Sequence, residues 1–466
     1  MAEAQQALEE EEEEEVGGGG GGGEKVVEDS FSAPLGSDLQ ESTLDARETK
    51  SILMESQVRA VLEAEGGKGA VMTSWNVIRQ KESSLHFGSI VVKLKIHFLK
   101  NNEPLEKTYV LKHNPNFNPA FTAYVTMLFN KEISFYKTLR PLLHREISAT
   151  SHTQLSIPRC MFTALKEGRE IIILEDLNSR GFQNIDRKKG MDVAHASLVM
   201  EELARIHASS ILLKKRLGPD EMRSQFDFLK RTWWNYMEGA EEMFIINMEG
   251  HLDIAASVLQ KLGGHEAAAN WVTALKPNIL QMIQGQTKDN PPFDVLCHAD
   301  CTISNFLFRY NGDQEVSKVV VLDFQMCLHA SLAIDLSSFF FCCLEGPIRR
   351  ANHKVFLDIY FQAFSRVLRA AGQVIPFSLN DLAEEYKKKI LYGAIMAILV
   401  VPLLAAEGGE DDEAPSLETI VDDKSFLVQR QDKLRKCLCL NGPLRTRFLD
   451  IFRDLIDLGI IQNQLP

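Results

Sequence analysis

Three side chains in the second half of the chain have the types and spacing that phosphoryl transfer from a nucleotide requires: Asp300, Asn305 and Asp323. This chemistry needs one carboxylate that accepts the proton of the attacking hydroxyl. It also needs carboxylate and amide oxygens to hold the metal ions that neutralise the phosphates. We therefore assign Asp300 as the catalytic base and Asn305 and Asp323 as Mg²⁺ ligands, with ATP as the phosphate donor.

The sequence around these residues narrows the assignment. The segment His298–Asn305 has the H-x-D-x-x-x-x-N spacing of a kinase catalytic loop, and Asp323 begins an Asp-Phe-Gln triplet. Alternating apolar residues predict strands over 305–310 and 319–324, and a hairpin between them would bring both loop ends into one site. Unrelated polar residues of surface loops are the alternative. An Asp-Phe pair at the end of an apolar strand is rarer by chance than an isolated D-x4-N spacing.

A second group of candidates lies in the N-terminal half. Lys112 closes the apolar stretch Thr108–Leu111, which predicts a strand, and Glu132 follows in a predicted helix. Kinases use a strand lysine on the α- and β-phosphates, steadied by a helix glutamate. Alone, Lys112 would be interpreted as an ordinary strand-end lysine, but the Asp300 motif favours the nucleotide-binding role. Lys131 adjoins Glu132, yet neighbouring helix residues do not share a face.

Two further segments complete the expected nucleotide site. The apolar strand Ile171–Leu174 leads into Glu175 and Leu177, whose backbone groups could bond adenine, although any strand that ends in a polar turn looks the same. Between the first two predicted strands, the segment 81–88 contains one glycine. Ser83 and Ser84 there could offer hydroxyl and backbone N–H groups to a phosphate.

The elements that would position these residues follow in a clear order. Strands are predicted over 71–78, 89–99, 108–112, 156–165 and 170–174, and helices over 49–65, 119–143, 193–209, 222–237, 252–262, 267–283, 351–371, 379–405 and 443–458. This order predicts an α+β, two-lobed fold with a small antiparallel β-sheet in the N-terminal lobe and a large helical C-terminal lobe. The expected domains are a disordered acidic and glycine-rich tail (1–48), an ATP-binding N-lobe (49–177), and a C-lobe with the catalytic loop and substrate-binding helices (178–466).

The charge of the chain is concentrated in its first residues. The formal net charge is -13, but residues 1–50 hold 15 acidic and 3 basic residues, whereas the other 416 hold 49 and 48. An unbroken acidic run (9–15) and an unbroken glycine run (17–23) cannot fold alone. The near-neutral body has no footprint for nucleic-acid binding, and no obligate protein partner is evident.

The cysteines and the apolar stretches indicate the compartment. Eight thinly spread cysteines, without a basic-then-apolar signal peptide, predict reduced thiols and a cytoplasmic location. The uncharged stretch 390–406 contains Gly393 and Pro402 and is shorter than the roughly 20 residues that a membrane span needs. It predicts a buried helix and no membrane span. The run Cys297–Cys301 holds zinc-type ligands, but no second ligand pair with zinc-site spacing follows it.

Longer stretches of the chain resemble one family. They are Leu174–Leu177, Gly181-Phe182, Gly190–His195, Leu203–Ala208, His298–Asn305, Asp323–Gln325, Ala333–Leu336 and Tyr386–Leu404. Over about 49–458 the chain resembles the ecdysteroid kinase-like (CHK kinase-like) family of the choline kinase and aminoglycoside phosphotransferase group. The resemblance implies a protein-kinase-like fold, ATP with Mg²⁺, a small alcohol as acceptor, and a structural role for Asp335 beneath the catalytic loop. Ala299 stands where the family usually has glycine.

The sequence leaves several alternatives for the molecule that accepts the phosphate. The aromatic residues Phe226, Phe228, Trp233, Trp234 and Tyr236 would suit a steroid-like alcohol, a quaternary ammonium group, or simple packing in the lobe core. The resemblance alone makes an ecdysteroid hydroxyl the leading expectation. A choline- or ethanolamine-type kinase is one alternative, and a pseudokinase or ATP-binding scaffold of the same fold is another, favoured by the glycine-poor phosphate loop. A protein kinase is less favoured, because the A-P-E signature is missing after Asp323.

Overall fold

The computed structural model describes residues 42–43, 52–65, 69–79, 89–114, 119–151, 154–218, 221–404 and 424–462. The predicted tail (1–48), apart from 42–43, and the predicted phosphate loop with Ser83 and Ser84 lie outside these ranges. From Gln40 onward the chain forms one compact unit. Within it, the α+β, two-lobed fold is confirmed, while the domain limits at 48 and 177 stay predictions.

The N-terminal lobe is built on an antiparallel sheet, whose described strands have the order β1-β2-β3-β4-β6-β5. They are β1 (Ser42–Thr43), β2 (Val71–Arg79), β3 (Ile90–Lys100), β4 (Glu103–His113), β5 (Cys160–Ala164) and β6 (Ile171–Glu175). The hairpin of β3 and β4 turns at Asn101 and Asn102, whose φ angles of 53° and 64° are those of a tight primed turn. The helix α2 (Glu55–Ala64) packs its apolar side against the strands, in a core that includes Val58 and Leu94.

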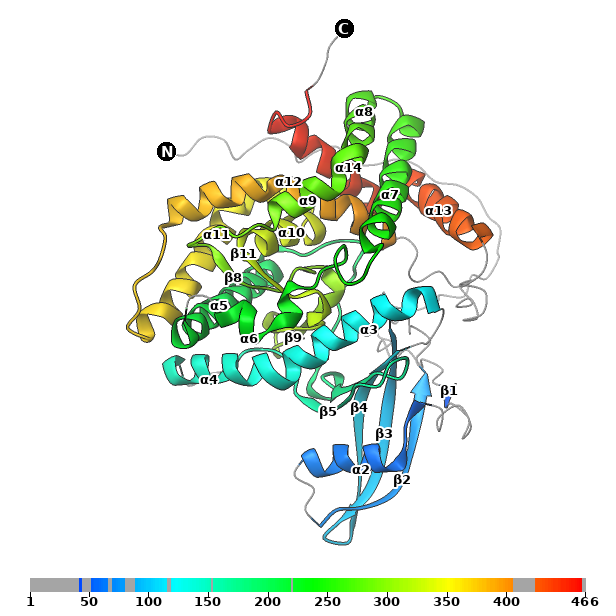
Figure 1. Ribbon diagram of the computed structural model, residues 1–466, viewed down its shortest axis with the longest axis vertical. Coiled ribbons are helices and arrows are strands. Elements are labelled where there is room, and N and C mark those ends of the chain that lie inside the picture. The colour runs from blue at the N-terminus through cyan, green and yellow to red at the C-terminus, as the bar shows by residue number, and fades with distance from the viewer. Residues whose placement is uncertain are drawn as a thin grey trace, which may run out of the picture. The chain divides into compact units, whose positions relative to one another are not determined.

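A long helix lies between this sheet and the helical lobe (Figure 1). It begins as α3 (Pro119–Ser134), passes through a π-helical turn (Phe135–Leu139) and ends as α4 (Arg140–Ser151). Leu128 and Phe129 of α3 share a core with Leu174 of β6, and α4 contacts α5 of the C-terminal lobe. The helix predicted over 119–143 is therefore confirmed, and it extends further than predicted.

The C-terminal lobe is mostly helical and carries two small sheets. Its helices are α5 (Val193–Leu217), α6 (Glu221–Gln225), α7 (Ala240–Leu262), α8 (Glu266–Leu275), α9 (Ile279–Gln286), α10 (Ala333–Cys343), α11 (Gly346–Ala370), α12 (Leu379–Leu403), α13 (Lys424–Cys439) and α14 (Pro443–Asp457). One small sheet joins β7 (Phe182–Gln183), β9 (Phe306–Tyr310) and β10 (Val316–Val321), and the other joins β8 (Asp294–Cys297) and β11 (Leu328–Ser331). The hairpin β9–β10 confirms the predicted pair of strands.

Two predicted helices are not continuous in the structure, and the helix predicted over 252–262 begins earlier than predicted, at Ala240. The range 222–237 holds only the end of α6 and a short 3₁₀ turn at Asp227–Lys230. Beyond it the Thr232 N–H donates to Asn235 Oδ1 (2.6 Å) and Asn235 Nδ2 donates to the Lys230 carbonyl (2.9 Å), so side-chain bonds replace helical ones. The range 267–283 is divided into α8 and α9 by a turn that contains Pro277, which has no N–H to donate.

The uncharged stretch 390–406 is confirmed as a buried helix as far as it is described. It forms the second half of α12, which packs against α10. Gly393 lies so close to α10 that a Cβ there would collide with the Ser337 backbone carbonyl. Among the helices formed by the described residues, none combines the length and apolar character needed to cross a membrane.

Candidate active site

The predicted catalytic loop follows β8 and leads into β9. Asn305 donates from Nδ2 to both the Asp300 carbonyl (2.8 Å) and Asp300 Oδ2 (3.0 Å), so the two predicted residues are in direct contact. His298 closes the loop from the other side. Its Nδ1 accepts from the Asp300 N–H (3.2 Å), which leaves Nε2 to donate to the Leu322 carbonyl (2.7 Å), next to Asp323. These bonds hold the Asp300 loop next to Asp323, as expected from the predicted hairpin between them.

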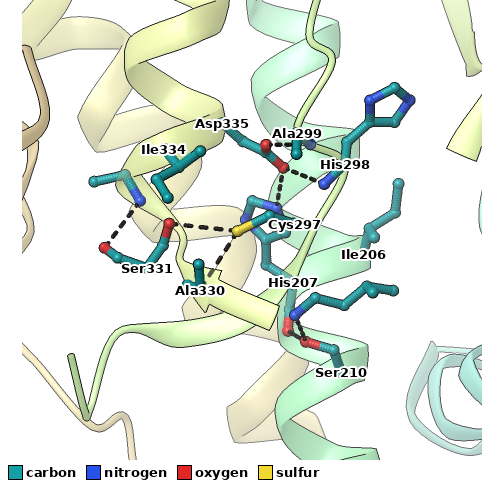
Figure 2. Close-up of polar contacts among 12 residues, drawn as sticks. Ile206, His207, Ser210, Cys297, His298, Ala299, Ala330, Ser331, Ile334 and Asp335 are labelled. Atoms are coloured by element: carbon teal, nitrogen blue, oxygen red, sulfur yellow. Dashed lines mark hydrogen bonds and ion pairs between the residues drawn. The ribbon is translucent and has the colours of Figure 1, made fainter. Parts of the chain in front are cut away.

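Asp335 supports the loop from beneath, in the first turn of α10. Its carboxylate accepts from the backbone N–H groups of His298 (2.6 Å) and Ala299 (2.8 Å), and it pairs with His207 Nε2 (3.0 Å), as Figure 2 shows. Asp335 and His207 are fully buried. Burial would raise the pKa of Asp335, but His207 and the loop N–H groups outweigh it and lower the pKa. Ala299 has a φ of 62°, a left-handed conformation in which glycine is favoured.

The predicted nucleotide-binding pair meets Asp323 in the interior. Lys112 Nζ on β4 lies 2.6 Å from Glu132 Oε2 on α3, 3.1 Å from Asp323 Oδ1 and 3.2 Å from Gln325 Oε1. The Lys112 and Glu132 side chains are only 7% and 1% exposed. Phe324 anchors the Asp323 turn, because its ring stacks on Phe135 with centroids 3.9 Å apart. Two segments about two hundred residues apart in the chain are thus joined by one ammonium group.

The pKa values of Asp300, Glu132 and Lys112 in this cluster are all raised. Burial, together with the nearby Asp323 carboxylate, raises the pKa of Asp300 to about 6, against the effects of His298 and Asn305. Burial also raises the pKa of Glu132 to about 7, although Lys112 opposes the shift. For Lys112, burial would lower the pKa, but Asp323 and Glu132 together raise it above its ordinary value. Glu132 Oε1 is buried and has no partner among the described residues.

This donor set fits Mg²⁺ with a nucleotide. Asp300 and Asp323 repel each other, and a cation between them would relieve that repulsion. Both Asn305 bonds use Nδ2, so the hard oxygen Oδ1 remains for a metal. No group of three or more His, Cys, Asp or Glu side chains converges on a metal position in the described part of the chain. A metal that relies on phosphate and water oxygens for most of its ligands needs no such group.

The other predicted binding residues lie at the end of β6. Glu175 sits on the last position of that strand, paired with Tyr109 of β4, the strand that carries Lys112. Its backbone N–H donates to the Arg159 carbonyl (3.0 Å), and the Leu177 carbonyl accepts from the Arg180 N–H (2.9 Å). Because the Glu175 N–H and the Leu177 carbonyl already take part in these bonds, the Glu175 carbonyl and the Leu177 N–H are the backbone groups left for adenine. The adenine-binding role of Glu175 and Leu177 stays a prediction, as does the phosphate-binding role of Ser83 and Ser84.

A narrow apolar pocket adjoins the catalytic loop. It is lined by Thr232, Trp233, Trp234, Phe244, Ile283, Ala299, Met326, Leu328, Tyr392 and Met396. Ala299 directly precedes the predicted base Asp300 in the catalytic loop, although Asp300 is not itself one of the lining residues. Trp233 and Trp234 both meet the Phe244 ring edge-on, at 5.9 and 5.6 Å. Two residues of the aromatic group found in the sequence therefore line this pocket, while Phe226 is buried in the lobe core.

The sequence alone did not assign three residues of this site to it. Gln325 is a third acceptor for Lys112, and His207 completes the support under the loop. Tyr392 reaches the pocket from α12, almost a hundred residues after Asp300. The Asp-Phe-Gln triplet could have indicated Gln325. His207 and Tyr392 lie in two of the stretches that resemble the family, Leu203–Ala208 and Tyr386–Leu404, but only the folded chain brings them to the loop.

Comparisons with known proteins identify a family and several distant relatives. The model of the ecdysteroid kinase-like family matches residues 84–373. A Caenorhabditis elegans protein named "Uncharacterized oxidoreductase dhs-27" is 20% identical over 316 residues, which cover 66% of this chain and 35% of that protein. The chain thus spans about a third of the length of this relative. Among solved structures, the GDP complex of aminoglycoside 2'-phosphotransferase-IIIa is 12% identical, with 86% of this chain and 100% of that chain covered and a TM-score of 0.39. The macrolide 2'-phosphotransferase MphH from Brachybacterium faecium is 13% identical, with coverages of 77% and 100% and a TM-score of 0.30.

Proposed function

The chain belongs to the ecdysteroid kinase-like family, and from this premise we propose that it is a small-molecule kinase that transfers the γ-phosphate of Mg-ATP to a hydroxyl group of an alcohol. The observation that carries the proposal is the contact of Lys112 with both Glu132 and Asp323, beside the bonded pair Asp300 and Asn305. A buried lysine between two acids, next to a carboxylate of raised pKa, is a costly arrangement that function explains.

Each side chain has a role that follows from its contacts. When bound, Mg-ATP supplies the phosphoryl group and the metal charge that neutralises it. Asn305 Oδ1 and the Asp323 carboxylate would hold the metal, and Lys112 would bind phosphate oxygens while Glu132 keeps its ammonium group in place. Asp300 would accept the proton of the acceptor hydroxyl through Oδ1, because Oδ2 is bonded to Asn305. Adenine would bind backbone groups of Glu175 and Leu177.

We also propose that the acceptor is an apolar alcohol, with an ecdysteroid as the best candidate. None of the residues that line the pocket beside Ala299 carries a charge, and its walls are mainly aromatic and aliphatic. Such walls suit an uncharged ring system, although their aromatic residues would also suit the quaternary ammonium group of choline. The pocket is narrow, so a bulky acceptor requires some of the lining side chains to move aside. A cytoplasmic location is consistent with the eight free cysteines.

The proposal is tested by ADP release from Mg-ATP with a panel of ecdysteroids, choline and plant phenolics. Turnover is expected with at least one uncharged ring alcohol. Asp300→Asn should lose about 10²–10⁴-fold in kcat, the usual contribution of a general base, while its affinity for Mg-ATP stays measurable. Ser317→Ala, on the exposed hairpin strand β10, serves as the matched surface control. Absence of Mg-ATP binding by the wild-type protein would refute the kinase assignment.

A further inference from the structure

The lysine beside Glu132 lies in an unusual environment. Lys131 is 2% exposed, and its ammonium Nζ donates to one acceptor, the Arg231 carbonyl, at 2.6 Å. An ammonium group has three donors, and no carboxylate among the described residues pairs with this one. Burial lowers the pKa of Lys131 to about 8, with Cys327 opposing the shift. A buried, unpaired lysine costs stability, so its presence calls for a functional reason.

The position of Lys131 on α3 separates it from the nucleotide site. Consecutive helix residues point about 100° apart, so Glu132 faces Lys112 while Lys131 faces the segment after α6. Tyr124, seven residues earlier, lies on the same side of the helix as Lys131. Its ring packs against Tyr236 with centroids 5.3 Å apart. Two points on one face of α3 therefore contact the single segment 231–236.

This segment contacts α3 and also forms part of the lining of the proposed acceptor pocket. Thr232, Trp233 and Trp234 line the pocket, directly after the residue whose carbonyl Lys131 binds. The segment has little helical bonding of its own, and its turn depends on the Thr232 N–H bond to Asn235. Tyr124, whose ring is tilted against Tyr236, lies in the field of the predicted base, since burial and then the Asp300 charge raise the pKa of Tyr124.

We propose that Lys131 is a positioning residue for the acceptor: by holding the Arg231 carbonyl, it fixes the 231–236 wall to the helix that carries Glu132. The inference rests on the proposed function, since the wall matters only if the pocket receives an acceptor. It adds a physical link between the two halves of the site. Lys131 touches neither substrate, and it acts through Thr232–Trp234.

The first test needs no substrate. Lys131→Met keeps the length and apolar stem of the side chain but removes the donor. We expect the amides of Thr232 and Asn235 to exchange hydrogen about tenfold faster or more in this variant. We also expect its free energy of unfolding to be equal to or higher than that of the wild type, because a desolvated charge is removed. Lys137→Met, at an exposed position of the π-helical turn, is the matched control. Unchanged exchange at 232 and 235 would overturn the proposal.

The second test separates positioning from a structural role. With ecdysone as acceptor, Lys131→Met should raise the acceptor KM about tenfold or more, with kcat and the KM for Mg-ATP within about twofold of wild type. Lys131→Arg keeps a donor, so its acceptor KM should lie closer to the wild-type value than that of Lys131→Met. A lower stability with an unchanged acceptor KM would refute the positioning role. If the wild-type protein phosphorylates no acceptor, the proposed function fails, and the exchange experiment still decides whether Lys131 fixes the wall.

Discussion

The carboxylate of Asp335 should be the most sensitive single group beneath the catalytic loop. It accepts from the His298 and Ala299 N–H groups and from His207, with no exposure to solvent. In Asp335→Asn, an NH₂ group replaces one acceptor oxygen, so at least one buried N–H donor must face another donor. Hydrogen bonds to a charged group contribute about 1.5–3 kcal/mol each, and an unsatisfied buried group costs about 1–3 kcal/mol more. We expect the free energy of unfolding to fall by about 3–5 kcal/mol.

The measurement is denaturant unfolding at pH 7, followed by circular dichroism. The pKa of Asp335 is lowered in the fold. Its stabilisation is therefore fully present above the unfolded value of about 4 and is lost only as the pH falls through the lower folded value. Asp381→Asn is the matched control, because Asp381 also accepts a backbone N–H but lies exposed at the start of α12. Its substitution should cost much less than that of Asp335, because solvent can replace the lost bond. An Asp335→Asn variant no less stable than Asp381→Asn would refute the reasoning.

Two further predictions concern catalysis and packing. Because the pKa of Asp300 is raised to about 6 and a base must be deprotonated, kcat/KM should fall about tenfold per pH unit below that value, and a flat profile would contradict the assignment. Gly393→Ala should lower the free energy of unfolding by about 1–3 kcal/mol, because the new methyl group meets the Ser337 carbonyl. Gly285→Ala, in the open on α9, should raise it by about 0.5–1 kcal/mol, and equal effects of the two changes in unfolding experiments would refute this packing argument.

The parts of the site that the sequence predicted are those defined by short spacings. Asp300 and Asn305 are five residues apart on one loop, and their contact follows from that loop alone. Lys112 and Glu132 belong to a strand and a helix with clear periodicity, so their pairing could be expected from the order of the elements. In each case local sequence specifies the element, and the element places the side chain.

The parts that were missed depend on contacts between distant segments. The range 222–237 has apolar residues at helical spacing, but the Asn235 side chain and Lys131 of α3 bind backbone groups that a helix would use. Periodicity records which residues are buried and carries no information about such side-chain bonds. Only the resemblance to the family implied a helix at Asp335, and periodicity gave no sign of helix α10. Every one of its residues is buried, so it has no polar face to set a period.

The π-helical turn at Phe135–Leu139 determines whether the fold can tolerate the deletion of one residue from this helix. A π-helical turn holds one residue more than an α-helical turn, and one residue corresponds to a rotation of about 100°. Phe135 stacks on Phe324, and Leu143 and Ile147 of α4 are buried as well. The extra residue sets the rotation of α4 relative to α3, so all three side chains point into the protein only because it is present. Deleting it would restore a regular helix and rotate α4 away from α5. The packing on both sides of the turn thus depends on this one extra residue.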